Sequence, residues 1–277
     1  MKVTTFRKLK QIITGNKVTD GDGVQLTRII GSRNLSMLDP FLLLDSFETE
    51  KPEDYIGGFP AHPHRGFETV TYLLEGRMRH KDNAGNEGVI EPGGVQWMTA
   101  GSGIVHSEIP EQERGLLHGF QLWVNLPARA KMTAPAYQEF PAEQITREQL
   151  GNGGEVRVIS GKTNQGTVGP IVNEYVSPLY LDVSLSEGQV FEQAVADDAN
   201  AFVYVIEGEL AVGKQADRID TRQLGILENG SSIQLKANKQ ARFLVASAIP
   251  LNEPVVRGGP FVMNTKQQLE QAFSDYG

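Results

Sequence analysis

Two short segments of the sequence carry side chains that could bind a metal ion. His62 and His64 are two positions apart, and so are His106 and Glu108. On a β-strand, residues i and i+2 point to the same face with their backbones about 6.6 Å apart, so such side chains can lean toward one ion. Two pairs on facing strands supply three imidazoles and one carboxylate, a set that suits Fe(II), Mn, Ni, Cu or Zn and leaves open coordination positions. We therefore predict one mononuclear metal site built from His62, His64, His106 and Glu108.

The neighbourhood of these pairs supports the prediction. All five histidines of the chain lie between His62 and His118, and glycines 93, 94, 101 and 103 form the approach to the second pair. Proline between His62 and His64 cannot donate a hydrogen bond to a sheet, so we expect this strand at a sheet edge or bulge. The remaining histidines have plainer interpretations: His80 follows a turn and is expected at the surface or a pocket rim, and His118 is expected as a hydrogen-bonded barrel residue.

Two further sets of residues near the pairs are of interest. Arg65 could bind a ligand carboxylate or form a surface ion pair. Candidate pocket walls are Phe59, Trp97, Met98 and Gln121.

Positioning these pairs requires a β-rich scaffold. Short apolar or alternating runs bounded by glycine, proline, asparagine or aspartate recur along the chain, as in the segments 70–76, 118–125 and 202–208. This pattern is typical of a β-sandwich or barrel. At 277 residues the chain is long enough for two domains. We predict an all-β protein made of two barrels with a short C-terminal helix.

An internal repeat indicates that the two barrels arose by duplication. The segments 70–78 and 202–210 align without gaps, and a second pair of segments follows in the same order. The alignment puts Ala194 and Ala196 where His62 and His64 stand, and no histidine follows His118. We expect residues 1–135 to form the metal-binding barrel and residues 136–277 a structural barrel without metal.

The connection and the C-terminus have their own signals. Residues 131–154 contain two prolines and a Gly-Asn-Gly-Gly sequence, and are predicted as the linker with a short helical turn. The sequence from Thr265 to Gln268 fits a helix capping box, and Leu269, Ala272, Phe273 and Tyr276 follow helical spacing. We predict a terminal helix that packs on a barrel wall, and assign it to the second domain.

Composition excludes several classes of function. A net charge of −8 disfavours binding to nucleic acid or to an anionic membrane, although a basic protein partner stays possible. The chain has no cysteine, which rules out disulfides, thiolate metal sites and a cysteine nucleophile. No apolar run of about 20 residues and no signal peptide are present, so we expect a cytoplasmic protein, and a monomer.

The motifs resemble those of a known family. The segment 57–76 resembles the first cupin motif and the segment ending at His106 resembles the second. Nearly the whole chain is similar to the pirin family, whose hallmarks match the segments 62–76, 97–108, 117–127 and 259–265. Cupins in general take their carboxylate ligand from the first motif, here Glu68, whereas pirins take it two residues after the second-motif histidine, here Glu108. The resemblance favours Glu108, and Glu68 could still orient a ligand.

The resemblance implies a function with open alternatives. Some bacterial pirins cleave the flavonol quercetin with O2, which implies a metal-dependent dioxygenase here, with a small planar phenol as substrate, release of carbon monoxide and Glu108 as general base. Other pirins act as metal-binding regulators of transcription or of a metabolic enzyme, so a non-enzymatic protein-binding role is the alternative. A metal-dependent isomerase or hydrolase is a third possibility, because cupin barrels support many reactions. We expect one divalent metal per chain, Fe(II) first, with Ni, Mn, Zn or Cu as alternatives.

Overall fold

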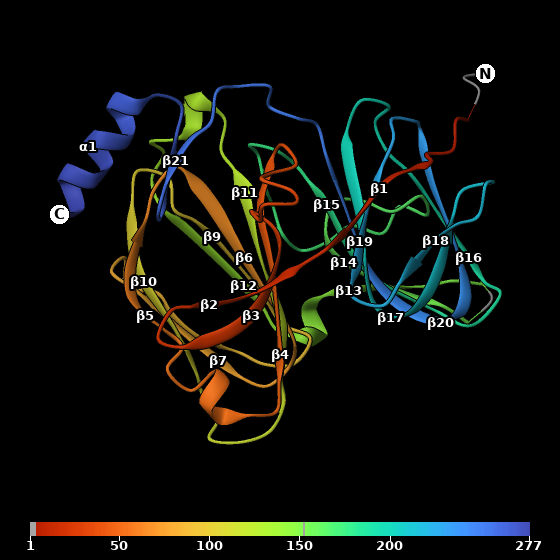
Figure 1. The fold of residues 1–277 in the computed structure, drawn as a ribbon, viewed down its shortest axis with the longest axis horizontal. Coiled ribbons are helices and arrows are strands. Elements are labelled where there is room, and N and C mark those ends of the chain that lie inside the picture. Colours follow the sequence, from red (N-terminus) through yellow and green to blue (C-terminus); the bar gives the residue numbers. More distant parts are fainter. Residues whose placement is uncertain (1–3, 152) are drawn as a thin grey trace. The chain divides into compact units, whose positions relative to one another are not determined.

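The computed structural model describes residues 4–151 and 153–277, and the regular secondary structure within them is mostly antiparallel β-strand (Figure 1). It divides into two compact units. We call the unit formed by residues 16–143 and 251–277 the histidine barrel, and the unit formed by residues 4–15 and 144–250 the second barrel. The predicted all-β class with two units and one C-terminal helix is confirmed.

The histidine barrel is built from two main sheets. Its elements are β2 (Asn16–Asp20), β3 (Val24–Ile30), β4 (Phe41–Thr49), β5 (Phe59–His64), β6 (Phe67–Glu75), β7 (Met78–Asp82), β8 (Glu87–Ile90), β9 (Val95–Thr99), β10 (Ile104–Pro110), β11 (Leu117–Asn125), β12 (Ala136–Phe140), β21 (Val256–Gly258), β22 (Phe261–Met263) and α1 (Lys266–Tyr276), with 3-10 turns at Pro52–Asp54 and Ala128–Ala130. One sheet has the order β12-β9-β6-β11-β4-β3-β2 and the other β5-β10-β7-β8, while β21 and β22 form a separate hairpin.

The second barrel has one large sheet. It contains β1 (Leu9–Thr14), β13 (Thr146–Gln149), β14 (Glu155–Ser160), β15 (Leu179–Leu185), β16 (Val190–Ala194), β17 (Asn200–Val212), β18 (Asp217–Asp220), β19 (Gln223–Leu227) and β20 (Ser232–Ala248). The order is β1-β19-β17-β20-β15-β14-β13, with β16 added to β20 and β18 to β17. Its interior is filled by a large apolar cluster that includes Val203, Leu235 and Phe243.

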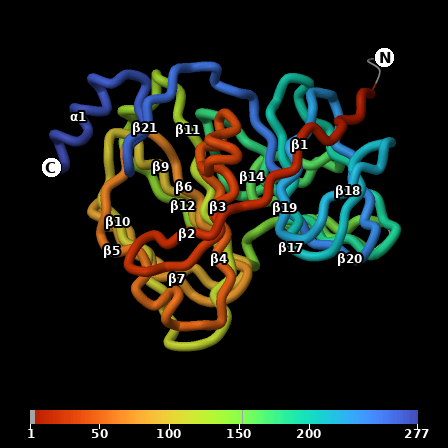
Figure 2. Tube along the Cα trace, in the orientation of Figure 1, coloured from red at the N-terminus to blue at the C-terminus, as the bar shows by residue number. Residues whose placement is uncertain are grey.

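The units differ from the predicted division at residue 135. Strand β1 pairs with β19, so the first residues of the chain belong to the second barrel and not to a domain 1–135. Residues 251–277 belong to the histidine barrel, and the blue C-terminal stretch can be followed there in Figure 2. Sequence patterns detect strands but carry no information on which sheet a terminal strand joins, because pairing is set by long-range register.

The linker and the helix were each predicted partly correctly. Residues 131–154 contain the predicted short helical turn, a 3-10 turn at Ala142–Gln144, but they are not a plain linker, because β12 pairs with β9 and β13 pairs with β14. Helix α1 begins with the predicted capping box, in which the Thr265 hydroxyl accepts from the backbone N–H of Gln268. It packs on β21 and β22 of the histidine barrel and not on the second barrel to which it was assigned. No helix in the described part of the chain is long and apolar enough to cross a bilayer.

Candidate metal centre

The four-stranded sheet places the predicted ligands on one face. In the register of β10 with β5, His106 lies opposite His62, and Ile104 lies opposite His64. Alternation along β10 turns Glu108 to the same face as His106. Strand β5 is the edge of this sheet, as predicted from Pro63, and the register shifts between His106 and Glu108.

Three histidines converge at this face. Candidate ligand atoms of His62, His64 and His106 all lie within 4.8 Å of one another. The ring centroids are 4.4 Å apart for His62 and His106, and 5.0 Å apart for His64 and His106. His64 and His106 are buried and His62 is half-buried, so the cluster is open to the pocket on one side.

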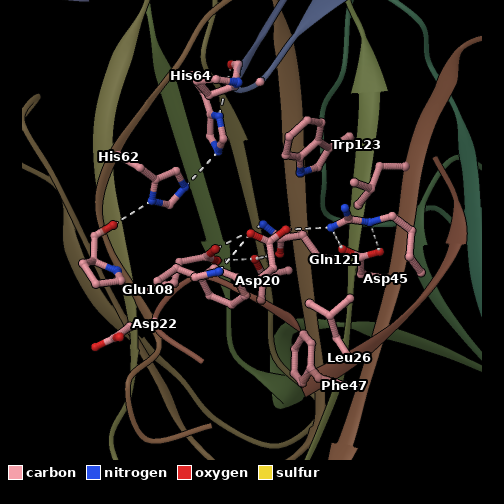
Figure 3. A pocket seen from close by; sticks show the side chains of 18 of the residues that line it. Asp20, Asp22, Leu26, Asp45, Phe47, His62, His64, Glu108, Gln121 and Trp123 are labelled. Atoms are coloured by element: carbon pink, nitrogen blue, oxygen red, sulfur yellow. Dashed lines mark hydrogen bonds and ion pairs between the residues drawn. The ribbon is translucent and has the colours of Figure 1, made fainter. Parts of the chain in front are cut away.

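Hydrogen bonds at the outer ring nitrogens orient these imidazoles. Nδ1 of His62 lies 2.8 Å from the carbonyl oxygen of Pro60, and Nδ1 of His64 lies 3.3 Å from that of Pro260. A carbonyl only accepts, so both Nδ1 atoms carry a hydrogen, and Nε2 of a neutral ring then has a free lone pair. The two Nε2 atoms nevertheless face each other at 3.0 Å (Figure 3).

This arrangement fits a metal ion. Two nitrogens bound at right angles to one ion at about 2.1 Å lie about 3.0 Å apart, which matches the His62–His64 separation. The third nitrogen, Nε2 of His106, is a buried polar atom with no hydrogen-bond partner among the described residues. An ion that accepts all three lone pairs would give Nε2 of His106 a partner. It would also remove the repulsion between the Nε2 atoms of His62 and His64.

Burial keeps the cluster in the state that a metal requires. It lowers the pKa of His64 to about 3, with a further lowering from His62. Burial, followed by the neighbouring histidines, also holds the pKa of His106 well below its ordinary value. Both rings are therefore neutral near pH 7, and a neutral imidazole is the metal-binding form.

Glu108 lies in the same pocket but outside the group of converging nitrogens. Its Oε1 is 2.6 Å from the hydroxyl of Thr71, and its Oε2 accepts from the Gln121 amide at 3.1 Å. Metal binding by Glu108 thus stays a prediction. Glu68 is buried on β6, accepts from the Thr99 hydroxyl at 2.7 Å, and is not among the pocket-lining residues.

The pocket beside the cluster has a volume of about 800 Å³. Apolar walls come from Leu26, Leu43, Phe47, Phe59, Met78 and Trp123, and the polar lining includes Thr71, Glu108 and Gln121. Of the predicted wall residues, Phe59 and Gln121 line the pocket, whereas Trp97 and Met98 are buried in the barrel and do not.

A partly buried ion pair that includes Asp45 lies on the far side of the pocket from the histidines (Figure 3). Arg28 donates to both carboxylate oxygens of Asp45, at 2.9 and 2.7 Å, and also to Asp20. Burial raises the pKa of Asp45 to about 6 against the lowering effect of Arg28. The pocket therefore presents fixed charges at one wall and imidazoles at the other.

The structure decides between the interpretations of three neighbouring residues. Arg65 forms an ion pair, the second of its two interpretations: it pairs with Asp275 at 2.7 Å and also donates to Ser102 O at 2.6 Å. His80 is not at the surface or a pocket rim, because it is fully buried behind His106. His118 lies on β11 beside Phe120 and outside the histidine group, as expected for a barrel residue.

Sequence reasoning also missed partners of the cluster. Nε2 of His80 forms a hydrogen bond with Asp82. These two residues are a third i, i+2 pair on a strand, so the spacing that identified the first two pairs could have identified this one. Pro260, whose carbonyl holds His64, comes from the C-terminal segment. Pro260 lies in the segment 259–265, which is similar to the pirin family, but its contact with His64 is tertiary and could not be read from that segment.

Comparison with known families agrees with this architecture. The model of the family described as pirin matches residues 23–124, and the model described as the pirin C-terminal cupin domain matches residues 180–277. The chain belongs to the pirin family.

Relatives of this pirin cover almost its full length. A pirin-like protein of Caulobacter vibrioides is 53% identical over 98% of this chain and 97% of its own, and pirin of Homo sapiens is 40% identical over 98% and 92%. A crystal structure of quercetin 2,3-dioxygenase from Acinetobacter baumannii superposes with a TM-score of 0.90 at 35% identity, covering 98% of this chain and 97% of that one.

Proposed function

We propose that this pirin is a metal-dependent dioxygenase that opens the central ring of a flavonol such as quercetin with O2 and releases carbon monoxide. The observation that carries the proposal is the convergence of three imidazole nitrogens beside a buried carboxylate, at the wall of a pocket with apolar sides. Similarity to a protein named quercetin 2,3-dioxygenase supports the same activity.

The residues of the pocket have separable tasks. His62, His64 and His106 would hold the ion, which when bound acts as a Lewis acid that makes a phenolic hydroxyl easier to deprotonate. Glu108 takes the proton of the flavonol 3-hydroxyl as general base. The deprotonated flavonol then reacts with O2, its central ring opens, and carbon monoxide leaves.

The walls suit a planar aromatic substrate. Phe59 and Trp123 offer aromatic surface, and Met78 offers a polarisable thioether. Thr71 and Gln121 hold the carboxylate of Glu108 in place, so the base need not reorganise when substrate enters. A cavity of about 800 Å³ has room for planar phenols of varied substitution.

Several predictions from the sequence belong with this proposal. We take Fe(II) as the expected ion. The same donors also accept Ni, Mn, Zn or Cu, and the availability of each metal decides between them. A monomeric state, cytoplasmic location and the lack of direct nucleic-acid binding stay predictions.

A paired measurement on one sample tests the function. Metal content is determined by elemental analysis, and aerobic quercetin loss is followed by absorbance for the iron-loaded and the chelated protein. We expect one metal per chain and metal-dependent loss of quercetin, with both absent in His106→Ala and both retained in His118→Ala. One metal per chain without turnover would reject the dioxygenase in favour of a metal-binding regulator, and no metal would reject the site itself.

A further inference from the structure

His80 connects the candidate metal centre to a buried carboxylate. It lies on β7 next to β10 and is fully buried, with its ring stacked on Tyr137 at a centroid distance of 4.9 Å. Nδ1 of His80 is 3.4 Å from Nδ1 of His106, and Nε2 of His80 is 3.1 Å from Asp82 Oδ2. Both ring nitrogens of His80 are thus engaged, one toward a predicted metal ligand and one toward Asp82.

The carboxylate at the end of this chain is itself held in place. Asp82 Oδ1 accepts the backbone N–H groups of Ala84 and Asn86 at 2.9 and 3.0 Å, and Oδ2 accepts the Asn86 side chain at 2.9 Å. Burial would raise the pKa of Asp82, but the hydrogen bonds from Asn86 and His80 outweigh it and lower the pKa. Asp82 is therefore an ionised group that only accepts hydrogen bonds.

Counting protons along the chain fixes the tautomers. Because Asp82 only accepts, Nε2 of His80 carries a hydrogen, and in neutral His80 the other nitrogen is a bare acceptor. Nδ1 of His106 must then donate to Nδ1 of His80. That leaves the lone pair of His106 on Nε2, the buried atom that has no hydrogen-bond partner within residues 4–151 and 153–277.

We propose that Asp82 and His80 are positioning residues that fix the tautomer and ring orientation of His106 for metal binding. The proposal rests on the metal site proposed above. His62 and His64 are oriented by backbone carbonyls, whereas His106 depends on side chains for the same purpose. Removing partners of this kind weakens metal binding by about 10- to 100-fold in metal sites generally.

The tautomers can be measured in the metal-free protein. Long-range ¹H–¹⁵N spectra of ¹⁵N-histidine-labelled, chelated wild type should show His106 as the neutral Nδ1–H tautomer near pH 7, and should show a hydrogen on Nε2 of His80. Spectra of the His80 and His106 variants assign the signals. A neutral Nε2–H tautomer at His106, or an unprotonated Nε2 at His80, would overturn the proposal, and the tautomers themselves are read in the wild-type protein.

Zn(II) affinity, measured by competition with a chelating dye, provides the second readout. His80→Phe keeps the ring but offers no acceptor, and should weaken Zn(II) binding by about 10- to 100-fold. His80→Asn returns an amide oxygen near the Nδ1 position and should recover most of the loss. Asn86→Ala is the matched control, since it removes another donor from the same carboxylate without touching His80, and it should change affinity less than twofold.

Equal Zn(II) affinity in His80→Phe and wild type would overturn the proposal, as would an Asn86→Ala loss as large as that of His80→Phe. Neither readout uses quercetin. A protein that binds Zn(II) with the expected tautomers but does not consume quercetin would contradict the proposed function and leave this inference standing.

Discussion

At the scale of single residues, the hydrogen bonds that each side chain already makes determine which of its atoms in the candidate metal centre can bind a metal. Nδ1 of His62 and Nδ1 of His64 donate to carbonyls, so their Nε2 atoms are left to face each other across 3.0 Å. Glu108 differs, because both of its oxygens have partners, Thr71 and Gln121, that lie in the pocket wall. The imidazoles are thus arranged to donate lone pairs, and the carboxylate is arranged to accept a proton near them.

This difference gives a prediction for Glu108→Gln. The amide is nearly isosteric but is not a base, so we expect metal to be retained with weakened affinity while kcat for quercetin falls by about 10²- to 10⁴-fold. Glu68→Gln is the matched control, since that carboxylate bonds to Thr99 outside the pocket, and its kcat should stay within a fewfold of wild type. Steady-state kinetics of the iron-loaded variants decide the matter. Unchanged rates in Glu108→Gln, with a large loss in Glu68→Gln, would move the catalytic carboxylate to Glu68.

At the scale of elements, the C-terminal segment completes the histidine barrel. The carbonyl of Pro260, just before β22, holds His64, and Arg65 donates its backbone N–H to the same carbonyl oxygen. Lys131 fastens this segment to the barrel: its buried ammonium donates to Val262 O at 2.8 Å, Gly66 O at 2.7 Å and Asn125 Oδ1 at 2.6 Å. Three donors meet three acceptors, so one side chain joins β22 to the turn that follows His64.

Lys131 predicts a pH dependence of stability. Burial lowers its pKa to about 7, from 10.5 in its ordinary state. Between these values the unfolded chain binds a proton that the folded barrel does not, so this residue's contribution to the free energy of unfolding rises as pH increases from 7 to about 10. The contribution is lost as pH falls through 7.

Denaturant unfolding of chelated wild type and Lys131→Met at several pH values isolates this contribution. The variant lacks the titrating group, so the free energy of unfolding of wild type should increase relative to that of the variant from pH 7 to pH 10. A difference that stays constant over that window would contradict the lowered pKa of Lys131.

Local pattern was enough to predict the strands and the histidine cluster, because strand alternation acts over two residues and brings His62 and His64 to one face. It was also enough for helix α1, whose capping box lies within four residues. It failed for His80, where a buried environment is created by Tyr137 from a distant strand. It failed again for Pro260, which is far from His64 in sequence, and for β1, whose partner β19 is more than 200 residues away.

At the scale of the whole molecule, the two barrels share an architecture and differ in what fills them. The second barrel has a continuous apolar interior, and Ala194 and Ala196 stand at the positions aligned with His62 and His64. The histidine barrel instead contains a pocket next to a smaller apolar cluster. Three members of that cluster, Leu26, Phe47 and Met78, also line the pocket. The predicted ligands all belong to the histidine barrel, so metal affinity should not depend on the stability of the second barrel.

Arg7 allows this independence to be tested. It is fully buried in the second barrel and donates to the carbonyl oxygens of Gly230, Ala199 and Ala196 at 2.8, 2.7 and 2.7 Å. Arg7→Ala leaves buried carbonyls without donors, and we expect a loss on the order of 3 kcal/mol in that unit.

Hydrogen exchange followed by mass spectrometry locates the effect of Arg7→Ala. Exchange should accelerate in β1, which follows Arg7 in the sequence, and in its partner strand β19. It should stay unchanged in β5 and β10 of the histidine barrel. Zn(II) affinity should equal that of wild type, because no predicted ligand lies in the affected unit. Arg147→Ala removes an exposed guanidinium from β13 of the same barrel and should alter exchange little. Faster exchange in β5 and β10, together with weaker Zn(II) binding, would instead mean that the two units unfold as one and that the second barrel supports the metal centre energetically.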